Sequence, residues 1–238
     1  MSLSALRSPA DRLAEVRQRI SAAATASGRD PAEITTIIVT KFHPVSLVRE
    51  LIALGAHDFG ENRHQEAQQK ARELAGEPVT WHFVGQLQSK KARQVAGYAH
   101  VIHSIDRDSV VKSLAGGAGA DGVDAVARPV TDCFVQVNLT TDPRRGGVAP
   151  ESLEPLVEKV LTTDCLRLLG VMAVAPADGE PARAFAEVRT YSERVLAMAP
   201  EARFISAGMS HDFESAIAHG ATHLRIGSAI TGNRPEHG

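Results

Sequence analysis

Short apolar runs rich in valine and isoleucine alternate along this chain with amphipathic stretches, and glycine or polar turns separate them. Such a pattern is typical of parallel strands connected by helices. It predicts a leading helix over about Pro9 to Ser27, ahead of the first strand. The predicted strands span 35–41, 57–61, 79–85, 100–105, 133–139, 167–174, 203–208 and 223–229. Helices are predicted between them at about 45–54, 63–75, 88–95, 151–161, 181–198 and 212–218.

The number of strand–helix units favours closure of the sheet into one (β/α)8 barrel, the TIM barrel fold of the α/β class, with an extra N-terminal helix. We expect residues 1–238 to form this single domain. An open doubly wound sheet is the second possibility, but a GxGxxG turn would then normally follow an early strand, and none does. Residues 115–126, AGGAGADGVDAV, are predicted to be a flexible surface loop.

Composition and charge limit the kinds of molecule that this protein is expected to bind. Of the 238 residues, 43% are hydrophobic and 23% are charged, as in an ordinary globular protein. The formal net charge of −2 argues against nucleic acid as a partner. The N-terminal segment carries Asp11 and Glu15 where a signal peptide needs apolar residues, and no apolar run is long enough to span a bilayer. Together with Cys133 and Cys165, which lack CxxC spacing, these features predict a cytoplasmic protein with reduced thiols and no membrane partner.

Candidate chemistry gathers where the predicted strands end. Active sites of (β/α)8 barrels lie at the carboxyl ends of the strands, and the loops after strands seven and eight often hold a phosphate. The first of these loops contains Ser206, Met209 and Ser210, and the second contains Gly227 and Ser228. Glycine allows close approach to the backbone, and free N–H groups and hydroxyls donate to phosphate. The pattern predicts a phosphate cradle, although the same residues also suit ordinary βα turns.

Two basic residues stand in apolar surroundings. Lys41 ends the first predicted strand, where desolvation would lower the pKa of its amine and suit it to attack an aldehyde or ketone. A surface lysine is the ordinary alternative. Arg225, between Leu224 and Ile226, needs a partner, either a carboxylate or the ring nitrogen of a pyridine cofactor. Asn62, at the end of the second strand, would bind a ligand or cap the next helix.

Other kinds of site are not indicated. His82 is expected to be a hydrogen-bonded histidine of the core. The ten histidines show neither HExxH nor clustered Cys/His spacing, so no metal site is expected. The sequence has no GxSxG motif that would indicate a serine hydrolase.

Taken in order, these segments resemble the YggS/PROSC family of pyridoxal 5′-phosphate (PLP) homeostasis proteins over about residues 13–234. The resemblance is carried by VTKFHP around Lys41, FGENRHQE from Phe59, WHFVGQLQSKK from Trp81, HSID from His103, QVN from Gln136, LLGVMAVAP from Leu168, SAGMSHDFESAI from Ser206 and RIGSAITGNR from Arg225. Each segment is a weak signal alone, but their order and spacing together are highly specific.

The resemblance implies a barrel similar to the N-terminal domain of alanine racemase, with PLP bound as a Schiff base on Lys41. It implies that Arg225 faces the pyridine nitrogen and that Asn62 lies near the ring. The phosphate would be held by Ser206, Gly227 and Ser228, with the backbone of Met209 and Ser210.

The chain departs from the family pattern at three places. His43 stands where the family usually has a second lysine, two residues after the Schiff-base lysine. Residues 90–91, Lys–Lys, replace Asn–Lys, and residues 145–147, Arg–Gly–Gly, replace Lys–Ser–Gly. None of these positions is the Schiff-base lysine or lies in the two phosphate loops.

Three functions remain to be weighed. The favoured one is a PLP-binding homeostasis protein, not an enzyme, that buffers the reactive aldehyde and delivers it to PLP-dependent apoenzymes. The alternative, a PLP-dependent amino-acid racemase, needs a base on each face of the substrate α-carbon, and in related enzymes a second domain supplies one.

This chain ends at Gly238, just past the eighth strand, and Tyr98 and Tyr191 fall in helical contexts, which leaves His82 as the candidate second base. The third function is a class I aldolase-like barrel in which Lys41 attacks a sugar-phosphate ketone. Without a second domain, the open barrel mouth favours a monomer.

Overall fold

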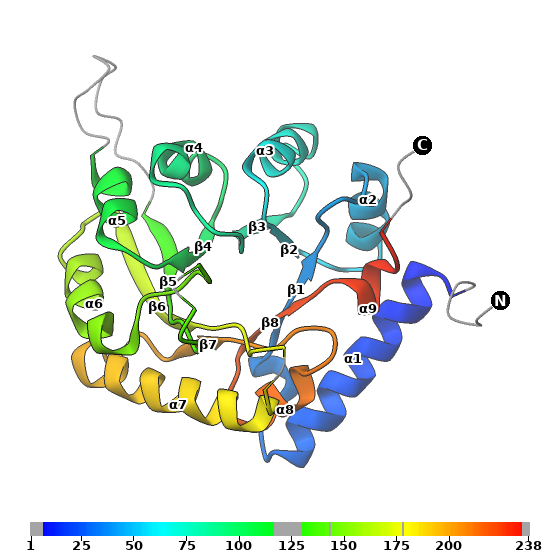
Figure 1. The fold of residues 1–238 in the computed structure, drawn as a ribbon. Helices are drawn as coiled ribbons and strands as arrows, with labels where there is room; N and C mark the ends of the chain where they lie inside the picture. Colours follow the sequence, from blue (N-terminus) through cyan, green and yellow to red (C-terminus); the bar gives the residue numbers. More distant parts are fainter. Residues whose placement is uncertain (1–6, 117–129, 143, 178, 235–238) are drawn as a thin grey trace.

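Eight parallel strands close into one barrel in this computed structural model, which describes residues 7–116, 130–142, 144–177 and 179–234. Each strand pairs with the next along the chain, and β1 pairs with β8 to close the barrel (Figure 1). The predicted (β/α)8 fold is therefore confirmed. The strands are β1 (Thr35–Val39), β2 (Asp58–Glu61), β3 (Thr80–Phe83), β4 (Val101–Ile105), β5 (Thr131–Gln136), β6 (Leu166–Met172), β7 (Phe204–Ser206) and β8 (His223–Ile226).

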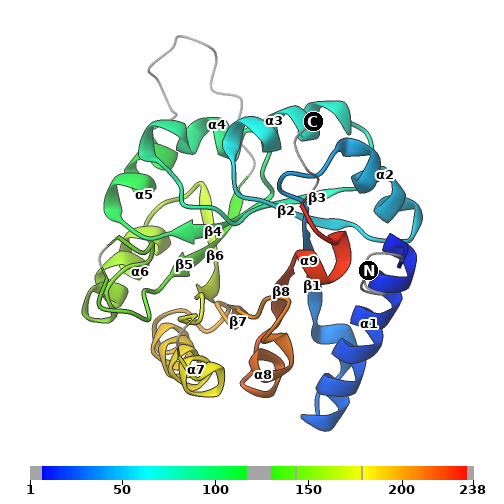
Figure 2. The ribbon, with the colours of Figure 1, turned by 45° about the vertical axis from the view of Figure 1, so that its right-hand side comes forward.

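Helices form a ring around these strands (Figures 1 and 2). They are α1 (Pro9–Ala26), α2 (Val45–Ala53), α3 (His64–Glu73), α4 (Ala92–Ala96), α5 (Asp108–Ala115), α6 (Leu153–Leu161), α7 (Pro181–Met198), α8 (Phe213–Ala218) and α9 (Ser228–Thr231). Short 3-10 turns lie at η2 (Pro31–Glu33), η3 (Ser89–Lys91) and η4 (Pro150–Ser152). No helix in the described ranges is both long and apolar enough to cross a membrane.

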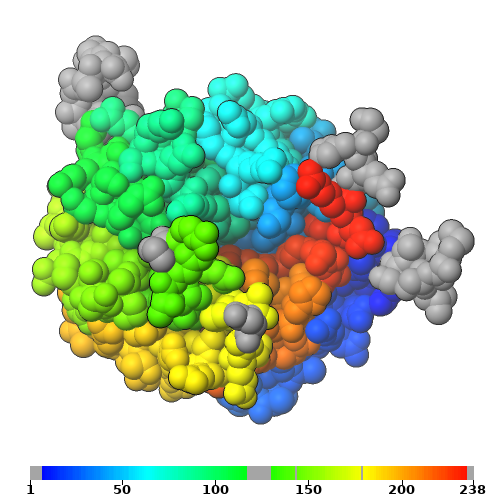
Figure 3. Space-filling view, in the orientation of Figure 1, coloured from blue at the N-terminus to red at the C-terminus, as the bar shows by residue number. Residues whose placement is uncertain are grey.

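The predicted extra helix is α1, and it begins with a strong local signal. Ser8 accepts a hydrogen bond from the Asp11 amide while the Asp11 carboxylate accepts one from the Ser8 amide, and Pro9 occupies the first helical position. The helix packs against α8 and α9, so the first and last helices of the described structure lie side by side. In the space-filling view, red residues of the carboxyl-terminal part border the blue amino-terminal part (Figure 3).

Several details differ from the sequence prediction. Strand β8, predicted to reach residue 229, ends at Ile226, because residues 228–231 form α9. Strand β1 ends at Val39 and not at Lys41. Helices α5 and α9 were not predicted, and Ala115, expected to begin a loop, is the last residue of α5. The remainder of the predicted loop, 117–126, lies outside the described residues.

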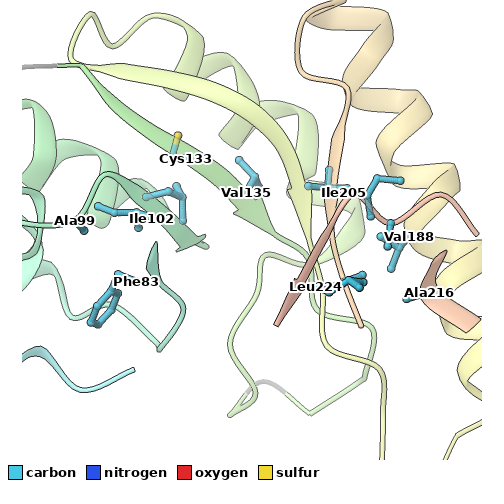
Figure 4. Close-up of a cluster of buried hydrophobic side chains, with 14 of the residues drawn as sticks. Phe83, Ala99, Ile102, Cys133, Val135, Val188, Ile205, Ala216 and Leu224 are labelled. Atoms are coloured by element: carbon cyan, nitrogen blue, oxygen red, sulfur yellow. The ribbon is translucent and has the colours of Figure 1, made fainter. Parts of the chain in front are cut away.

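The main hydrophobic core fills the space between the sheet and the helices. Figure 4 shows part of it, where Ile102 of β4 lies beside Ala99, and Val188 of α7 lies near Ala216 of α8. A smaller cluster of Val101, Phe134 and Met172 occupies the inside of the barrel. Branched apolar residues usually fill such an interior.

Here the interior also contains three histidines and one arginine, His82, His103, His223 and Arg225. Their contacts run between strands, and His103 of β4 reaches across the barrel interior to Ser206 of β7. Buried polar groups need partners, so this polar interior organises the end of the barrel where the candidate site lies.

Candidate functional site

Lys41 lies in a tight turn directly after β1. The turn is closed by a hydrogen bond of 3.0 Å from the His43 amide to the Thr40 carbonyl, and the Lys41 residue is exposed. The expectation that the protein itself buries the Lys41 amine is therefore wrong. Because β1 ends at Val39, Lys41 lies in the turn after the strand, where it is exposed to solvent.

A buried ion cluster holds this turn in place. The Lys70 ammonium group, from α3, donates to the Thr40 carbonyl at 2.8 Å, to Glu61 Oε1 at 2.6 Å and to Glu66 Oε1 at 2.8 Å. Glu61 Oε1 also accepts from the Thr40 hydroxyl at 2.7 Å, and Glu66 Oε1 accepts from the Phe42 amide at 2.6 Å. The residues on both sides of Lys41 are thus fixed by charged groups of β2 and α3.

The charge on Glu61 is costly at this position. Burial raises the pKa of its carboxyl group, while Lys70 and the Thr40 hydroxyl act in the opposite direction. Glu61 Oε2 is buried and finds no hydrogen-bond partner among the described residues. A half-satisfied carboxylate of this kind makes the cluster sensitive to any change in its lysine.

Phe42 has an unusual backbone conformation beside Lys41. Its φ is 68°, which residues other than glycine rarely adopt. The guanidinium of Arg63 lies 4.6 Å from the centre of its ring and that of Arg234 lies 4.0 Å away. These cation–π contacts offset part of the backbone strain and bring two further cations close to the turn that carries Lys41.

Asn62 directly follows β2, as predicted. Its backbone lies so close to Gly85, in the segment after β3, that only glycine fits at position 85. A Cβ on Gly85 would lie 2.2 Å from the Asn62 carbonyl oxygen and 2.6 Å from its Cα. The side-chain oxygen Oδ1 of Asn62 is buried and has no hydrogen-bond partner among the described residues. Such an unpaired acceptor is costly in a protein without a ligand.

The two predicted phosphate loops lie together. The Ser210 hydroxyl after β7 accepts from the Ala229 amide after β8 at 3.3 Å, and the Arg225 amide donates to the Gly208 carbonyl at 2.9 Å. Gly208 has a φ of 94°, and a Cβ there would lie 2.7 Å from the Ala216 side chain. The Met209 amide donates to Asp212 Oδ1 at 2.6 Å, so this amide is already engaged.

Ser206 does not lie on that cradle. It is completely buried, its hydroxyl accepts from Arg225 Nη1 at 2.7 Å, and it contacts His103 Nδ1 at 2.8 Å. The implied phosphate role of its side chain is therefore corrected: this hydroxyl is used inside the barrel. The alternation of a strand explains the difference, because the inward residue at the end of β7 points to the barrel axis and not to the loop above it.

Arg225 is a fully buried cation with neutral partners. Besides Ser206, its guanidinium donates to the Ala173 carbonyl at 2.8 Å. Burial lowers the pKa of Arg225 to about 10, while the charge of Asp212 acts to raise it. A buried guanidinium satisfied by a hydroxyl and a carbonyl retains donors for a further acceptor.

His43, where the family pattern has a second lysine, is buried beneath the Lys41 turn. Burial lowers the pKa of its imidazole, and the positive charge of Lys70 lowers it further, whereas Glu66 raises it. At neutral pH this position therefore carries a neutral ring and not a second cation.

Sequence reasoning missed the cluster of Glu61, Glu66 and Lys70, and also the role of His103. The FGENRHQE segment contains both glutamates, and Glu66 and Lys70 have the i,i+4 spacing of a helical ion pair, so a signal existed. His82 is buried and hydrogen-bonded in the core as expected. Among the described residues, no three His, Cys, Asp or Glu side chains gather in a way that could hold a metal ion.

The chain is similar to known proteins in sequence and in fold. The family model of the alanine racemase N-terminal domain matches residues 12–235. A pyridoxal phosphate homeostasis protein of Pseudomonas aeruginosa is 40% identical over 225 residues, which cover 94% of this chain and 95% of that protein. One of Mycobacterium leprae is 38% identical over 232 residues, covering 92% and 90%. The solved structure of PipY from Synechococcus elongatus with PLP bound has a TM-score of 0.79 at 32% identity and covers 94% of this chain and 100% of that one.

Proposed function

The chain belongs to the family of alanine racemase N-terminal domains, and from that membership we propose that it is a pyridoxal phosphate homeostasis protein, which binds PLP and buffers its supply in the cell. The observation that carries this proposal is Arg225. Its guanidinium is buried, and its hydrogen-bond partners in the described structure, a hydroxyl and a carbonyl, are neutral. It can therefore donate a further hydrogen bond to the ring nitrogen of a pyridine, which is a single acceptor.

The other residues also fit PLP. Asn62 offers a buried acceptor that the described residues leave unpaired, as expected for a group that meets a ligand. The loops after β7 and β8 lie side by side, so Ser210, Gly227 and Ser228 can hold one phosphate from two directions, whereas the Met209 amide is engaged by Asp212. Arginine at the ring nitrogen would keep that nitrogen unprotonated and weaken the cofactor as an electron sink, which suits storage better than catalysis.

We propose that Lys41 is the residue that holds PLP covalently. PLP supplies an aldehyde, which an unprotonated lysine amine attacks to form a Schiff base with loss of water. Lys41 is exposed, so its amine is reachable by the cofactor, and a Schiff base there would be reachable by other amines. That accessibility supports exchange of PLP with PLP-dependent apoenzymes as partners.

An amino-acid racemase is less well supported by the geometry. Both ring nitrogens of His82 are engaged, with His103 at 2.9 Å and with Asp58 at 3.0 Å, so the ring has no nitrogen free for a substrate. Burial raises the pKa of Tyr98, whose hydroxyl faces His64, so its phenolate is a poor candidate for the second base. Tyr191 lies in the outer helix α7.

We further propose that the protein acts as a monomer in the cytoplasm. Cys133 is buried and Cys165 is half-buried, and both are free thiols, which is the typical state in a reducing compartment. The large apolar side chains exposed in the described ranges are Val130, Leu161, Val174 and Met209, and they come from four different segments of the chain. Sedimentation equilibrium tests the monomer: a mass near 25.3 kDa supports it, and twice that mass contradicts it.

The first test is the visible absorption spectrum of the purified protein with PLP, before and after borohydride, followed by peptide mass spectrometry. We expect a yellow band that borohydride converts to a pyridoxyl group on Lys41. Lys41→Ala should lose the band, while Lys90→Ala, which removes another exposed lysine, should keep it. A colourless wild-type protein that stays unmodified would contradict the proposal.

Two further assays separate the roles that remain. Incubation of the PLP-loaded protein with L-alanine or D-alanine should leave the enantiomer unchanged, and interconversion would instead support the racemase. Mixing the loaded protein with a PLP-dependent apoenzyme, in the presence of an enzyme that destroys free PLP, should restore the apoenzyme's activity if PLP is handed over directly.

A further inference from the structure

A continuous line of hydrogen bonds crosses the interior of the barrel. Arg225 Nη1 donates to the Ser206 hydroxyl at 2.7 Å, and this hydroxyl lies 2.8 Å from His103 Nδ1. His103 Nε2 lies 2.9 Å from His82 Nδ1, and His82 Nε2 lies 3.0 Å from Asp58 Oδ1. The line joins β8, β7, β4, β3 and β2, and it ends at the first residue of β2, on the opposite end of the barrel from Lys41.

The chemistry of arginine fixes the direction of every bond in this line. A guanidinium has donors and no acceptor, so Ser206 must accept from Arg225, and its own proton must go to His103 Nδ1. His103 then carries its proton on Nε2 and donates to His82 Nδ1. His82 in turn carries its proton on Nε2 and donates to the Asp58 carboxylate. Both tautomers therefore follow from one arginine.

The opposite direction does not satisfy the groups present. If His103 donated to Ser206, the hydroxyl would accept from two sides and its proton would face no acceptor. His82 Nε2 would then present a lone pair to the Asp58 carboxylate, which would need a proton of its own. Burial makes such mismatches costly, since Ser206 and His103 are 0% exposed and His82 is 3% exposed.

We infer that Ser206, His103 and His82 are positioning residues: they form a one-way hydrogen-bond chain, anchored on Asp58, that holds the Arg225 guanidinium in place toward the site. The inference rests on the proposed function for the identity of the ligand that Arg225 faces. The chain itself belongs to the cofactor-free protein, so it can be tested without PLP.

The surroundings of His103 keep its ring neutral, as the one-way hydrogen-bond chain requires. Its ring stacks on Phe134 at 4.6 Å, and it faces His82, His223, Ser206 and Arg225. Burial holds the pKa of His103 well below its ordinary value, and the positive charge of Arg225 acts in the same direction. A proton on Nδ1 would compete with Arg225 for the Ser206 oxygen, so a neutral His103 is what the geometry requires.

The first experiment is nitrogen-15 NMR of the histidine rings in the cofactor-free protein between pH 6 and 8. We expect His82 and His103 both to be neutral with the proton on Nε2, and assignment uses His82→Gln and His103→Gln. In Ser206→Ala the Nδ1 resonance of His103 should move toward that of an imidazole nitrogen without a donor. A wild-type ring with its proton on Nδ1, or a charged His103, would overturn the inference.

The second experiment asks whether the chain acts on the site. His103→Phe keeps a flat ring on Phe134 but removes both hydrogen bonds, whereas His103→Gln keeps one acceptor and one donor. We expect PLP affinity to fall by about tenfold in Ser206→Ala, which loses a hydrogen bond to the charged Arg225. A similar fall is expected in His103→Phe, which leaves the Ser206 proton without its acceptor, and affinity should recover largely in His103→Gln.

Equal PLP affinity in wild type, His103→Phe and Ser206→Ala, each shown to be folded by its thermal transition, would overturn the positioning role. Failure of the wild type to bind PLP would instead contradict the proposed function, and the NMR experiment would still decide whether the chain exists.

Discussion

At the scale of single residues, the contact between Gly85 and Asn62 is the tightest constraint on the site. A Cβ at position 85 would overlap the Asn62 backbone, with 2.2 Å to its carbonyl oxygen, so one of the two loops would have to move. We expect Gly85→Ala to destabilise the protein by about 1–3 kcal/mol, the usual cost of overpacking, and to weaken PLP binding because Asn62 is displaced. Urea unfolding and a PLP titration measure the two effects.

Gly179→Ala is the matched control for this prediction. A Cβ there would make ordinary contact with the Pro176 side chain at 3.4 Å, so stability should stay within about 0.5 kcal/mol of wild type. If Gly85→Ala proves as mild as Gly179→Ala, the loops around Asn62 are looser than the structure indicates.

Individual residues also show where sequence reasoning succeeds and where it fails. The position of Arg225 in an apolar strand was sufficient to predict a buried cation in need of a partner. For Lys41 the sequence left a desolvated amine and a surface lysine both open, and the structure shows the exposed one. The turn with Phe42 at positive φ that follows β1 could not be predicted from the local sequence. Ser206 was misassigned because its direction depends on strand register, which only the closed barrel fixes.

At the scale of elements, the Lys70 cluster ties α3 to β1 and β2. Lys70→Met removes the only charge that compensates Glu61 at hydrogen-bond distance in the described structure, together with the donor to the Thr40 carbonyl. We expect a loss of about 3–5 kcal/mol at pH 7.5 in urea unfolding, as for other buried pairs broken on one side. The loss should shrink as pH falls, because a protonated Glu61 no longer needs the cation.

A double variant separates the charge effect from lost packing. Adding Glu61→Gln to Lys70→Met removes the uncompensated carboxylate but keeps an acceptor for the Thr40 hydroxyl. We expect the double variant to be more stable than Lys70→Met alone. If the stability losses of the two substitutions simply add, the uncompensated Glu61 carboxylate is not the cause of the loss in Lys70→Met.

The contact between α1 and α9 provides a second prediction at this scale. Arg12 of α1 donates to the Ile230 carbonyl of α9 at 2.6 Å, and α9 begins directly after Gly227. Arg12→Ala should speed hydrogen–deuterium exchange in residues 227–232 and lower PLP affinity by a few-fold, because local opening would loosen one phosphate loop.

Arg17→Ala is the control on the same helix, since Arg17 donates to the Leu54 and Gly55 carbonyls at the end of α2. Its effect on exchange should appear near residue 55 and not in α9. Equal exchange in α9 for wild type and Arg12→Ala would show that α1 does not support the phosphate loop.

A helix was predictable from the sequence where its apolar residues recur with a clear helical period. Helix α7 is an example, since its bounds of Pro181–Met198 agree with the prediction. The helices that were missed are short or adjoin low-complexity sequence. Helix α9 has four residues, too few for a helical period to show, and α5 runs into the glycine-rich stretch. Their formation depends on packing against neighbours and not on local pattern.

At the scale of the whole molecule, the barrel carries a histidine-rich interior where most such barrels are apolar. The sequence revealed the barrel through its eightfold alternation, but not which polar residues face one another across it. His82 and His103 are 21 positions apart and lie on the neighbouring strands β3 and β4. His103 and Ser206 are 103 positions apart and lie on β4 and β7, so only closure of the sheet brings these two together.

This interior makes a prediction about acid stability. His223 lies among Phe134, Phe204 and His103, and burial, the largest cause, lowers its pKa from 6.5 to about 4. Between these two values the unfolded chain binds a proton on His223 that the folded protein does not, so stability falls as pH falls through this window. A shift of this size corresponds to a loss of up to about 3 kcal/mol from His223.

Urea unfolding at pH 7.5, 6, 5 and 4 measures this loss, and His223→Phe should flatten the curve between pH 6.5 and 4. Phenylalanine suits the aromatic surroundings but gives up the 2.9 Å contact of His223 Nδ1 with the Thr222 hydroxyl, so a uniform offset at all pH values is also expected. His57→Gln removes an exposed imidazole instead and should keep the wild-type slope. If His223→Phe and wild type lose stability in parallel, the acid sensitivity comes from other groups, with the fully buried His103 the first to test because its pKa is also lowered by burial.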